Sequence, residues 1–169
     1  GTDASYRSGV YLRGDEANEE RNNGTFRNGP TNIMGDVINS DPAYVKNVDY
    51  RHSQLPPSIL GQSSYGAYVT SNASRTAMVY VGANDGKLYG FNALTGVEEF
   101  SYVPAGVYQN LTHLTDPLYT HRFYVDGGIT VGDAYLGGTW RTLLLAGLNA
   151  GGNTIAHRGR EWLSRAGLY

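Results

Sequence analysis

The most regular hydrophobic pattern of the chain lies at residues 77–103. Met78-Val79-Tyr80-Val81 is a continuous apolar run, which predicts a strand buried on both faces. Asn84-Asp85-Gly86 follows and is typical of a tight hairpin, because Gly supplies the positive φ that such a turn needs. After a return strand, Thr95-Gly96 predicts a second turn. The pattern therefore predicts an antiparallel meander with its second and third strands at 87–92 and 97–103.

Further strands are predicted on both sides of this meander. Residues 34–45 alternate loosely and contain Pro42, which favours a strand with a proline near an edge or bulge. Residues 128–136 and 140–148 predict two strands joined by a Gly137-Gly138 turn.

One short helix is predicted, at 105–114. Val107, Leu111 and Leu114 recur at helical spacing. Pro104 is compatible with the first turn of a helix, and Asp116-Pro117 ends it.

Three segments lack a clear pattern. Residues 1–33 are polar and rich in Asn, Gly and Arg, and we interpret them as an N-terminal arm or loop. Residues 46–76 contain Pro56-Pro57 and clusters of Ser, Asn and Gly, so they are expected to be an irregular insertion, long for a compact domain. Residues 153–169 are interpreted as a divergent or artefactual tail.

A weak internal repeat relates residues 75–86 to 140–151. Gly82, Asn84 and Gly86 correspond to Gly147, Asn149 and Gly151, an offset of 65 residues. A second similarity relates Gly35-Asp36 to Gly132-Asp133. One supersecondary unit thus occurs twice, and a small sheet repeated in series is typical of a β-propeller.

The predicted fold class is therefore all-β and mainly antiparallel: a partial β-propeller with a short inserted helix. Residues 34–152 would form about two blades, with insertions at 46–76 and 104–127. Because a propeller has ~4–8 blades, the chain is expected to be part of a ring. Its uncovered strand edges predict that the isolated chain self-associates or is only marginally folded.

Composition supports this class and excludes others. Gly accounts for 23 residues and charged residues for only 17%, as expected of short strands and tight turns. The net charge of -2 gives no electrostatic case for nucleic acid, and no apolar run approaches the ~20 residues that span a bilayer. Absence of Cys excludes disulfides and thiolate zinc sites. No signal peptide is visible, and a start at Gly1 rather than Met is consistent with a removed N-terminal segment.

Several motifs carry a family resemblance over about residues 10–152. Residues 79–100 resemble a quinoprotein-like propeller blade. The order of the wider motifs is similar to the C-terminal propeller domain of the PilC/PilY-type family of type IV pilus tip adhesins and biogenesis factors. These motifs are YLRGD at 11–15, GDVINSDPAYV at 35–45, SYVPAGVYQNLTHLTDPLYTHRFYVDG at 101–127, TVGDAY at 130–135 and WRTLLLAGLNAGG at 140–152.

The resemblance implies a non-catalytic scaffold in type IV pilus biogenesis and tip-associated adhesion. It implies pilins, minor pilins or the pilus machinery as partners, together with an integrin-like host receptor. The implied location is extracellular at the pilus tip or associated with the outer membrane, after export through the periplasm. The chain departs from the family at 153–169, which lacks a V-x-A-L-D strand, and it has no D-x-D-x-D calcium loop. No cofactor is therefore expected in this fragment, and calcium only elsewhere in the complete protein.

Two other functions stay open. One is a fragment of a quinoprotein dehydrogenase that uses pyrroloquinoline quinone and calcium; the missing Cys, and Phe100 where such a blade carries Trp, count against it. The other is a periplasmic scaffold unconnected with pili.

The main candidate site is Arg13-Gly14-Asp15. In such a tripeptide the Asp carboxylate can complete an integrin's metal site while the Arg reaches an acidic pocket; the alternative is a simple turn. Asp15, Asn18, Glu19 and Glu20 could together bind calcium or form a solvated acidic loop.

Other polar groups favour structural interpretations. Asn84-Asp85-Gly86 could be a metal loop but is better explained as a turn. Three aspartates beside glycines could be acid–base pairs but are better explained as turn caps, and the four histidines lack ligand spacing. Four aromatic residues form either a contact surface or packing between blades. The three aspartates are Asp36, Asp126 and Asp133. The four histidines are His52, His113, His121 and His157. The four aromatic residues are Tyr108, Tyr119, Phe123 and Tyr124.

Overall fold

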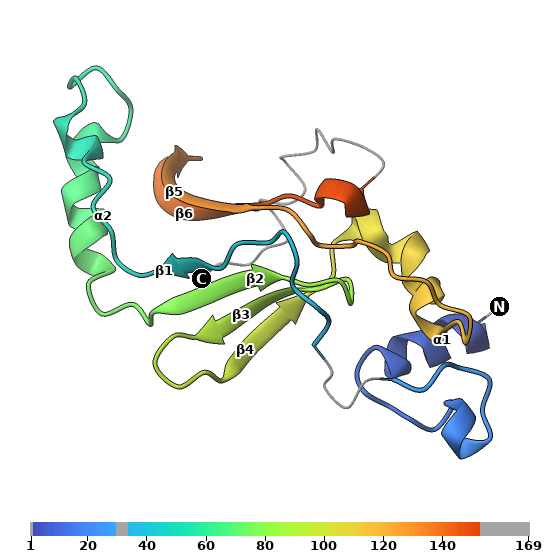
Figure 1. Cartoon of the computed structure of the whole chain (residues 1–169). Helices are drawn as coiled ribbons and strands as arrows, with labels where there is room; N and C mark the ends of the chain where they lie inside the picture. The colour runs from blue at the N-terminus through green and yellow to red at the C-terminus, as the bar shows by residue number, and fades with distance from the viewer. Residues whose placement is uncertain (1, 30–33, 153–169) are drawn as a thin grey trace.

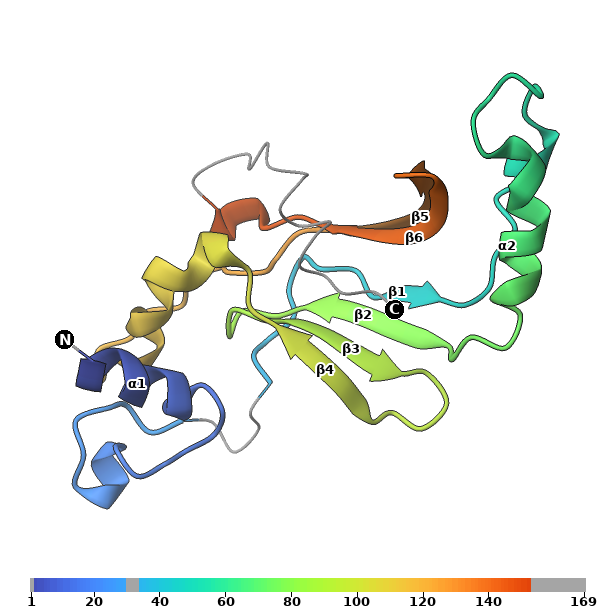
Figure 2. The same ribbon diagram turned by 180° about the vertical axis from the view of Figure 1, so that it is seen from behind.

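The computed structural model describes residues 2–29 and 34–152, and its strands form two antiparallel sheets. The first sheet has the order β1-β2-β3-β4 and the second pairs β5 with β6. In both views the β5–β6 hairpin lies beside the β1 edge of the first sheet (Figures 1 and 2). The strands are β1 (Ala43–Val45), β2 (Met78–Gly82), β3 (Leu88–Asn92), β4 (Glu98–Tyr102), β5 (Ile129–Leu136) and β6 (Thr139–Ala146).

The predicted meander is confirmed as β2, β3 and β4. Strand β2 pairs with β3 from Met78↔Asn92 to Gly82↔Leu88, and Gly86 in the connecting turn has φ 90°. A register shift between Gly90 and Phe91 bends the pairing with β4. Burial on both faces holds only for the second half of β2, since Met78 is partly exposed whereas Val81 is buried.

The strand expected at 34–45 is much shorter than predicted, since only β1 (Ala43–Val45) is extended and paired. The residues before it instead accept hydrogen bonds from backbone amides at the end of β2 and in the turn that follows. The carbonyl of Asp36 accepts from the Asn84 amide, and the Ser40 hydroxyl accepts from the Gly82 amide at 2.8 Å. Pro42 has no N–H for a ladder, which fixes the start of the strand at the next residue.

The second predicted hairpin is confirmed as β5–β6. All residues from Ile129↔Ala146 to Leu136↔Thr139 are in register. Gly137 and Gly138 have φ 60° and 85°, the positive pair that a two-residue type I′ turn requires.

Two segments interpreted as loops contain helices, which corrects those interpretations. The arm holds α1 (Thr2–Tyr11) and a 3₁₀ turn, η1 (Glu20–Asn22), and the 46–76 insertion holds α2 (Tyr65–Ser71) with the 3₁₀ turns η2 (His52–Gln54) and η3 (Gln62–Ser64). Short helices depend on tertiary packing rather than on propensity. Here the Tyr11 ring packs edge-on against Phe26, and Tyr65 is completely buried.

The predicted helix at 105–114 is confirmed as a 3₁₀ helix, η4 (Ala105–Thr115), and a last turn, η5 (Asn149–Gly151), follows β6. Val107 and Leu114 are buried with Tyr124 in one core cluster, and Leu111 packs against it. A second cluster lies on the sheet, around Val81, Ala83 and Tyr89. In the described residues no helix is both long and apolar enough to cross a membrane.

The sequence repeat corresponds to two equivalent hairpin units. The first hairpin unit (residues 36–86) contains β1 and β2, and the second hairpin unit (residues 126–151) contains β5 and β6. Each opens with an aspartate whose Oδ2 lies 3.4 Å from the Asn Nδ2 that follows its second strand: Asp36 with Asn84, and Asp126 with Asn149. The expected match of Asp36 with Asp133 is therefore wrong, because Asp133 lies inside β5 opposite Thr142.

Candidate functional site

The Arg13-Gly14-Asp15 tripeptide forms an exposed turn directly after α1. Gly14 has φ 90° and its amide donates to the Tyr11 carbonyl at 2.9 Å. Asp15 Oδ1 accepts from the Ala17 amide at 2.8 Å, which leaves its other oxygen facing solvent or a partner. The turn predicted as the alternative is thus present, and the same turn leaves the side chains of Arg13 and Asp15 accessible.

The four oxygen-bearing residues after this turn do not gather into a calcium site. Glu19 is buried; its Oε1 accepts from the Gly29 amide at 2.9 Å, and its Oε2 accepts from Arg21 Nε. Burial alone would raise the pKa of Glu19, but the hydrogen bonds from Arg21 and Gly29 outweigh it and hold the pKa below its usual value. Glu19 therefore links different parts of the N-terminal arm through hydrogen bonds and is not free to bind a metal.

Two further carboxylates, Asp85 and Asp126, are also engaged in structural contacts. Asp85 accepts from the Lys87 amide and from the Tyr89 hydroxyl, so the Asn84-Asp85-Gly86 segment serves as a hairpin turn. Asp126 is 1% exposed and accepts from the Asn39 amide at 3.1 Å and from Asn39 Nδ2 at 2.6 Å. No two of the described carboxylates are arranged as an acid–base pair by these contacts.

Two of the three described histidines have structural partners, and the third, His113, is partly exposed. His52 stacks on Trp140 with ring centroids 5.0 Å apart, and His121 Nε2 lies 2.8 Å from Asp36 Oδ2. His157 lies outside the described residues. Within 2–29 and 34–152 no group of three or more His, Asp or Glu side chains could hold a metal ion.

The aromatic residues near η4 divide between the two expected roles. Tyr124 is buried; its hydroxyl donates to the Asn110 carbonyl at 3.0 Å, and its burial, with Tyr119 nearby, raises its pKa to about 12. Arg27 stacks over the Tyr119 ring at 4.1 Å. Tyr108 is 56% exposed and Phe123 37%, so only these two are available for contact with another molecule.

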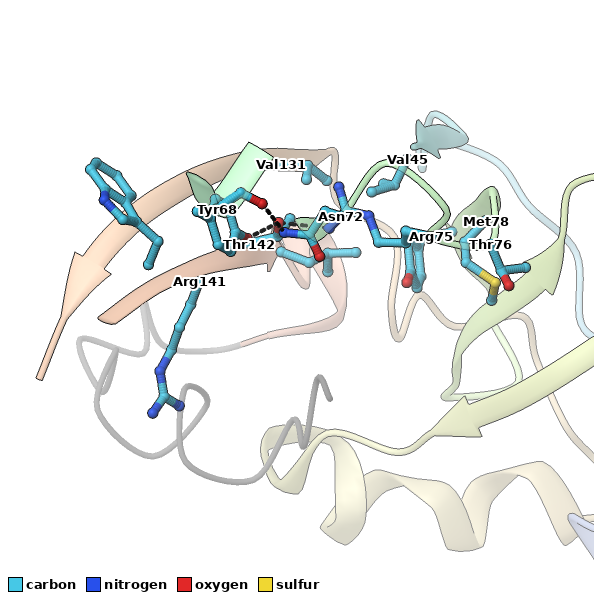
Figure 3. A pocket seen from close by; sticks show the side chains of 12 residues that line it. Val45, Tyr68, Asn72, Arg75, Thr76, Met78, Val131, Arg141 and Thr142 are labelled. Atoms are coloured by element: carbon cyan, nitrogen blue, oxygen red, sulfur yellow. Dashed lines mark hydrogen bonds between the residues drawn. The ribbon is translucent and has the colours of Figure 1, made fainter. Parts of the chain in front are cut away.

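A pocket of about 420 Å³ lies between the two hairpin units and α2. Figure 3 shows its residues coming from all three parts of the chain. The lining residues are Val45, Tyr68, Asn72, Arg75, Thr76, Met78, Tyr80, Val131, Trp140, Arg141, Thr142 and Leu144.

A polar network joins the insertion to the second hairpin unit along the wall of this pocket. Asp133 accepts from the Tyr65 hydroxyl and from Thr142 Oγ1, both at 2.8 Å. Thr142 Oγ1 in turn accepts from Arg75 Nη1 at 2.7 Å and lies 2.7 Å from the Tyr68 hydroxyl. Burial, followed by the donated bond to Asp133, raises the pKa of Tyr65 to about 12, so this phenol remains a donor at neutral pH.

This pocket could not be predicted from the sequence. Apart from Val45, its residues lie in two groups, within 68–80 and 131–144, and neither group has the spacing of a known site. The repeat was the available signal: residues 75–80 and 140–144 are equivalent starts of β2 and β6, and consecutive propeller blades place equivalent strands next to one another.

Comparison with known proteins places the chain in a family. The model of the PilY1 β-propeller domain matches residues 34–157. The type IV pilus biogenesis factor PilY1 of Pseudomonas aeruginosa strain PAK is 41% identical over 149 residues, which cover 86% of this chain and 12% of that protein. A PilY1 homolog of Xylella fastidiosa strain Temecula1 is 42% identical over 148 residues, with the same coverages.

A solved structure also matches. The chain resembles the crystal structure of the Pseudomonas aeruginosa PilY1 C-terminal domain with a TM-score of 0.47 and 35% identity, over 65% of this chain and 21% of that one. The chain spans 12% of the length of the curated relatives above.

The family match confirms the expected fold class, a β-propeller built of antiparallel sheets with few helices. It covers both hairpin units and the insertion between β1 and β2. The chain belongs to the PilY1 β-propeller domain family.

Proposed function

We propose that this chain is the propeller portion of a type IV pilus biogenesis factor, in which it acts as a non-catalytic scaffold. The observation that carries the proposal is the 41% identity to PilY1 over 86% of the chain. Proteins that bear the family name are pilus biogenesis factors, so the partners proposed for the complete protein are pilins, minor pilins or the pilus machinery. Its proposed location is the pilus tip or the outer cell surface.

The arrangement of the chain supports a scaffold role. Two sheets of paired strands provide a rigid frame, and the insertions at 46–76 and 104–127 extend from it, where loops commonly carry binding contacts. The dehydrogenase alternative shares the blade pattern at 79–100 with this chain, but the relatives that match 86% of the chain are pilus biogenesis factors.

The test is a count of surface pili by electron microscopy in a strain deleted for the complete gene. Complementation with the wild-type gene should restore pili, and complementation with a gene lacking the codons for residues 34–152 should not. Surface export of the shortened protein is the control, checked by immunoblot of sheared pili. Unchanged pilus numbers in the deletion strain would contradict the proposal.

Tip adhesion is the finer part of this proposal, and Arg13-Gly14-Asp15 is its candidate contact with an integrin-like host receptor. The exposed turn supports this assignment, because both charged side chains are accessible. Calcium use by the complete protein stays a prediction; chelation followed by a pilus count would test it.

The adhesion test uses Asp15→Asn, which removes the charge but keeps an oxygen that can accept from the Ala17 amide. Asp41→Asn, at another exposed aspartate, is the matched control. Asp15→Asn should reduce attachment of piliated cells to receptor-coated surfaces at an unchanged pilus count. Equal attachment by both variants and the wild type would show that the tripeptide plays no part in attachment.

A further inference from the structure

The lining of the pocket between the hairpin units combines apolar and polar side chains. Its apolar side chains include Val45, Met78, Val131 and Leu144. Its polar side chains include Tyr68, Asn72, Arg75 and Thr142. Its volume of about 420 Å³ lies within the ~300–1,000 Å³ of ligand sites, which combine apolar lining with a few placed polar groups.

The charge of the pocket comes from Arg75. No Asp or Glu is among its lining residues, and Arg75 makes no ion pair with another described residue. The nearest carboxylate in the network is Asp133, which lies behind the Thr142 hydroxyl and already accepts from Tyr65 and Thr142. The positive charge of the Arg75 guanidinium in this pocket is therefore not directly neutralised by a carboxylate.

Arg75 is held in position while several of its donors are unused. Its Nη1 donates to Thr142 Oγ1 at 2.7 Å and its Nη2 donates to the Lys46 carbonyl at 2.8 Å. Its Nε is buried, so the donors left for a ligand are the second N–H of Nη1 and the second N–H of Nη2. A guanidinium has five N–H donors in a planar fork that fits a carboxylate bidentately. Figure 3 shows Arg75 reaching across the pocket towards Thr142.

We propose that this pocket binds a small monocarboxylic acid with an apolar body. The carboxylate would pair with Arg75, and the apolar body would lie against Val45, Met78 and Val131. A single charge is favoured because Arg141, the other cation of the lining, extends away from the labelled polar residues (Figure 3). The proposal does not depend on the role in pilus biogenesis.

The test measures binding of 4-phenylbutyrate to the complete protein by saturation-transfer difference NMR and calorimetry. Its neutral amide, 4-phenylbutanamide, and inorganic phosphate serve as comparison probes. The acid should bind saturably, and both comparison probes should bind roughly tenfold or more weakly, because a charge-assisted hydrogen bond and apolar contact are needed together.

Two variants locate the binding. Arg75→Met should weaken binding of the acid roughly tenfold to a hundredfold, whereas Arg122→Met, at an exposed arginine outside the pocket, should leave it unchanged. Thr76→Glu puts a carboxylate at the exposed rim of the pocket and keeps both Arg75 hydrogen bonds. Its weaker binding of the acid therefore tests the proposal even if Arg75→Met fails to fold. Absence of saturable binding, equal binding of acid and amide, or wild-type affinity in Thr76→Glu would overturn the proposal.

Discussion

The two hairpin units are built from the same sequence pattern, but they differ in what connects their strands. In the second unit Gly137-Gly138 joins two strands of eight residues each. In the first unit residues 46–77 separate β1 from β2, which have only three and five residues. The intervening segment folds onto the second unit, where the Tyr65 ring packs at 4.6 Å from Trp140 and its hydroxyl bonds to Asp133.

The units also differ in how well they are covered. The first is covered by β3, and Tyr80, Val81 and Ala83 are buried. The second has no third strand within the described residues, and Leu145 is 57% exposed. An insertion in one unit thus supplies the buried contacts that its neighbour lacks. The comparison indicates that the insertion couples the two units.

The largest expected effect comes from isolating the chain. The 169-residue chain should self-associate or be only marginally folded, because neither edge of the β5–β6 sheet pairs with another strand in the described residues. Sedimentation velocity over a range of concentrations, together with a thermal melt, tests this. A monodisperse monomer with a cooperative melt would show that the second unit needs no further cover.

Tyr65→Ala removes the ring that joins the insertion to the second unit. Tyr65 is fully buried, so the loss should cost about 3–5 kcal/mol locally. Hydrogen exchange of the complete protein should show faster exchange in α2 and in β5–β6 together. Exchange confined to α2 would mean that the second unit is stable without the insertion.

Asp126→Ala should cost about 3 kcal/mol, because it leaves the Asn39 amide and side chain without their acceptor. Asp126 also lies near Asn149, so it joins the segment before β5 both to the segment that precedes β1 and to the turn after β6. Amide hydrogen exchange around residues 39 and 149 should be faster in this variant than in the wild type. Asp41→Asn, on an exposed aspartate nearby, is the control and should change neither.

The equivalent asparagines give a matched pair with a smaller effect. Asn84→Ala should cost about 1–3 kcal/mol, because the buried Tyr124 amide loses its acceptor at 3.0 Å. Asn149→Ala should cost about 1 kcal/mol, since Asn149 is exposed and has one long bond, and most of the cost comes from its φ of 46°, which Ala adopts less readily than Asn. Equal costs, measured by local exchange, would mean that both units are equally enclosed in the complete protein.

The parts of this fold that could be predicted are those with strong local signals. The apolar run at 78–81, the glycine turns and the spacing of Val107 and Leu114 predicted β2, both hairpins and η4. Helix α2 could not be predicted, because it has only seven residues and is held by burial of Tyr65 against residues about 70 positions away. The exposed turn at Arg13-Gly14-Asp15 could be predicted, whereas the pocket around Arg75 depends on contacts between distant segments.

Hydrogen exchange of the wild-type complete protein tests most directly whether the insertion and the second hairpin unit form one body. If they do, amides of residues 65–71 and 129–146 become exposed through the same opening, with equal free energies and equal denaturant dependence. Rapid exchange in α2 alongside full protection in β5–β6 would contradict this prediction.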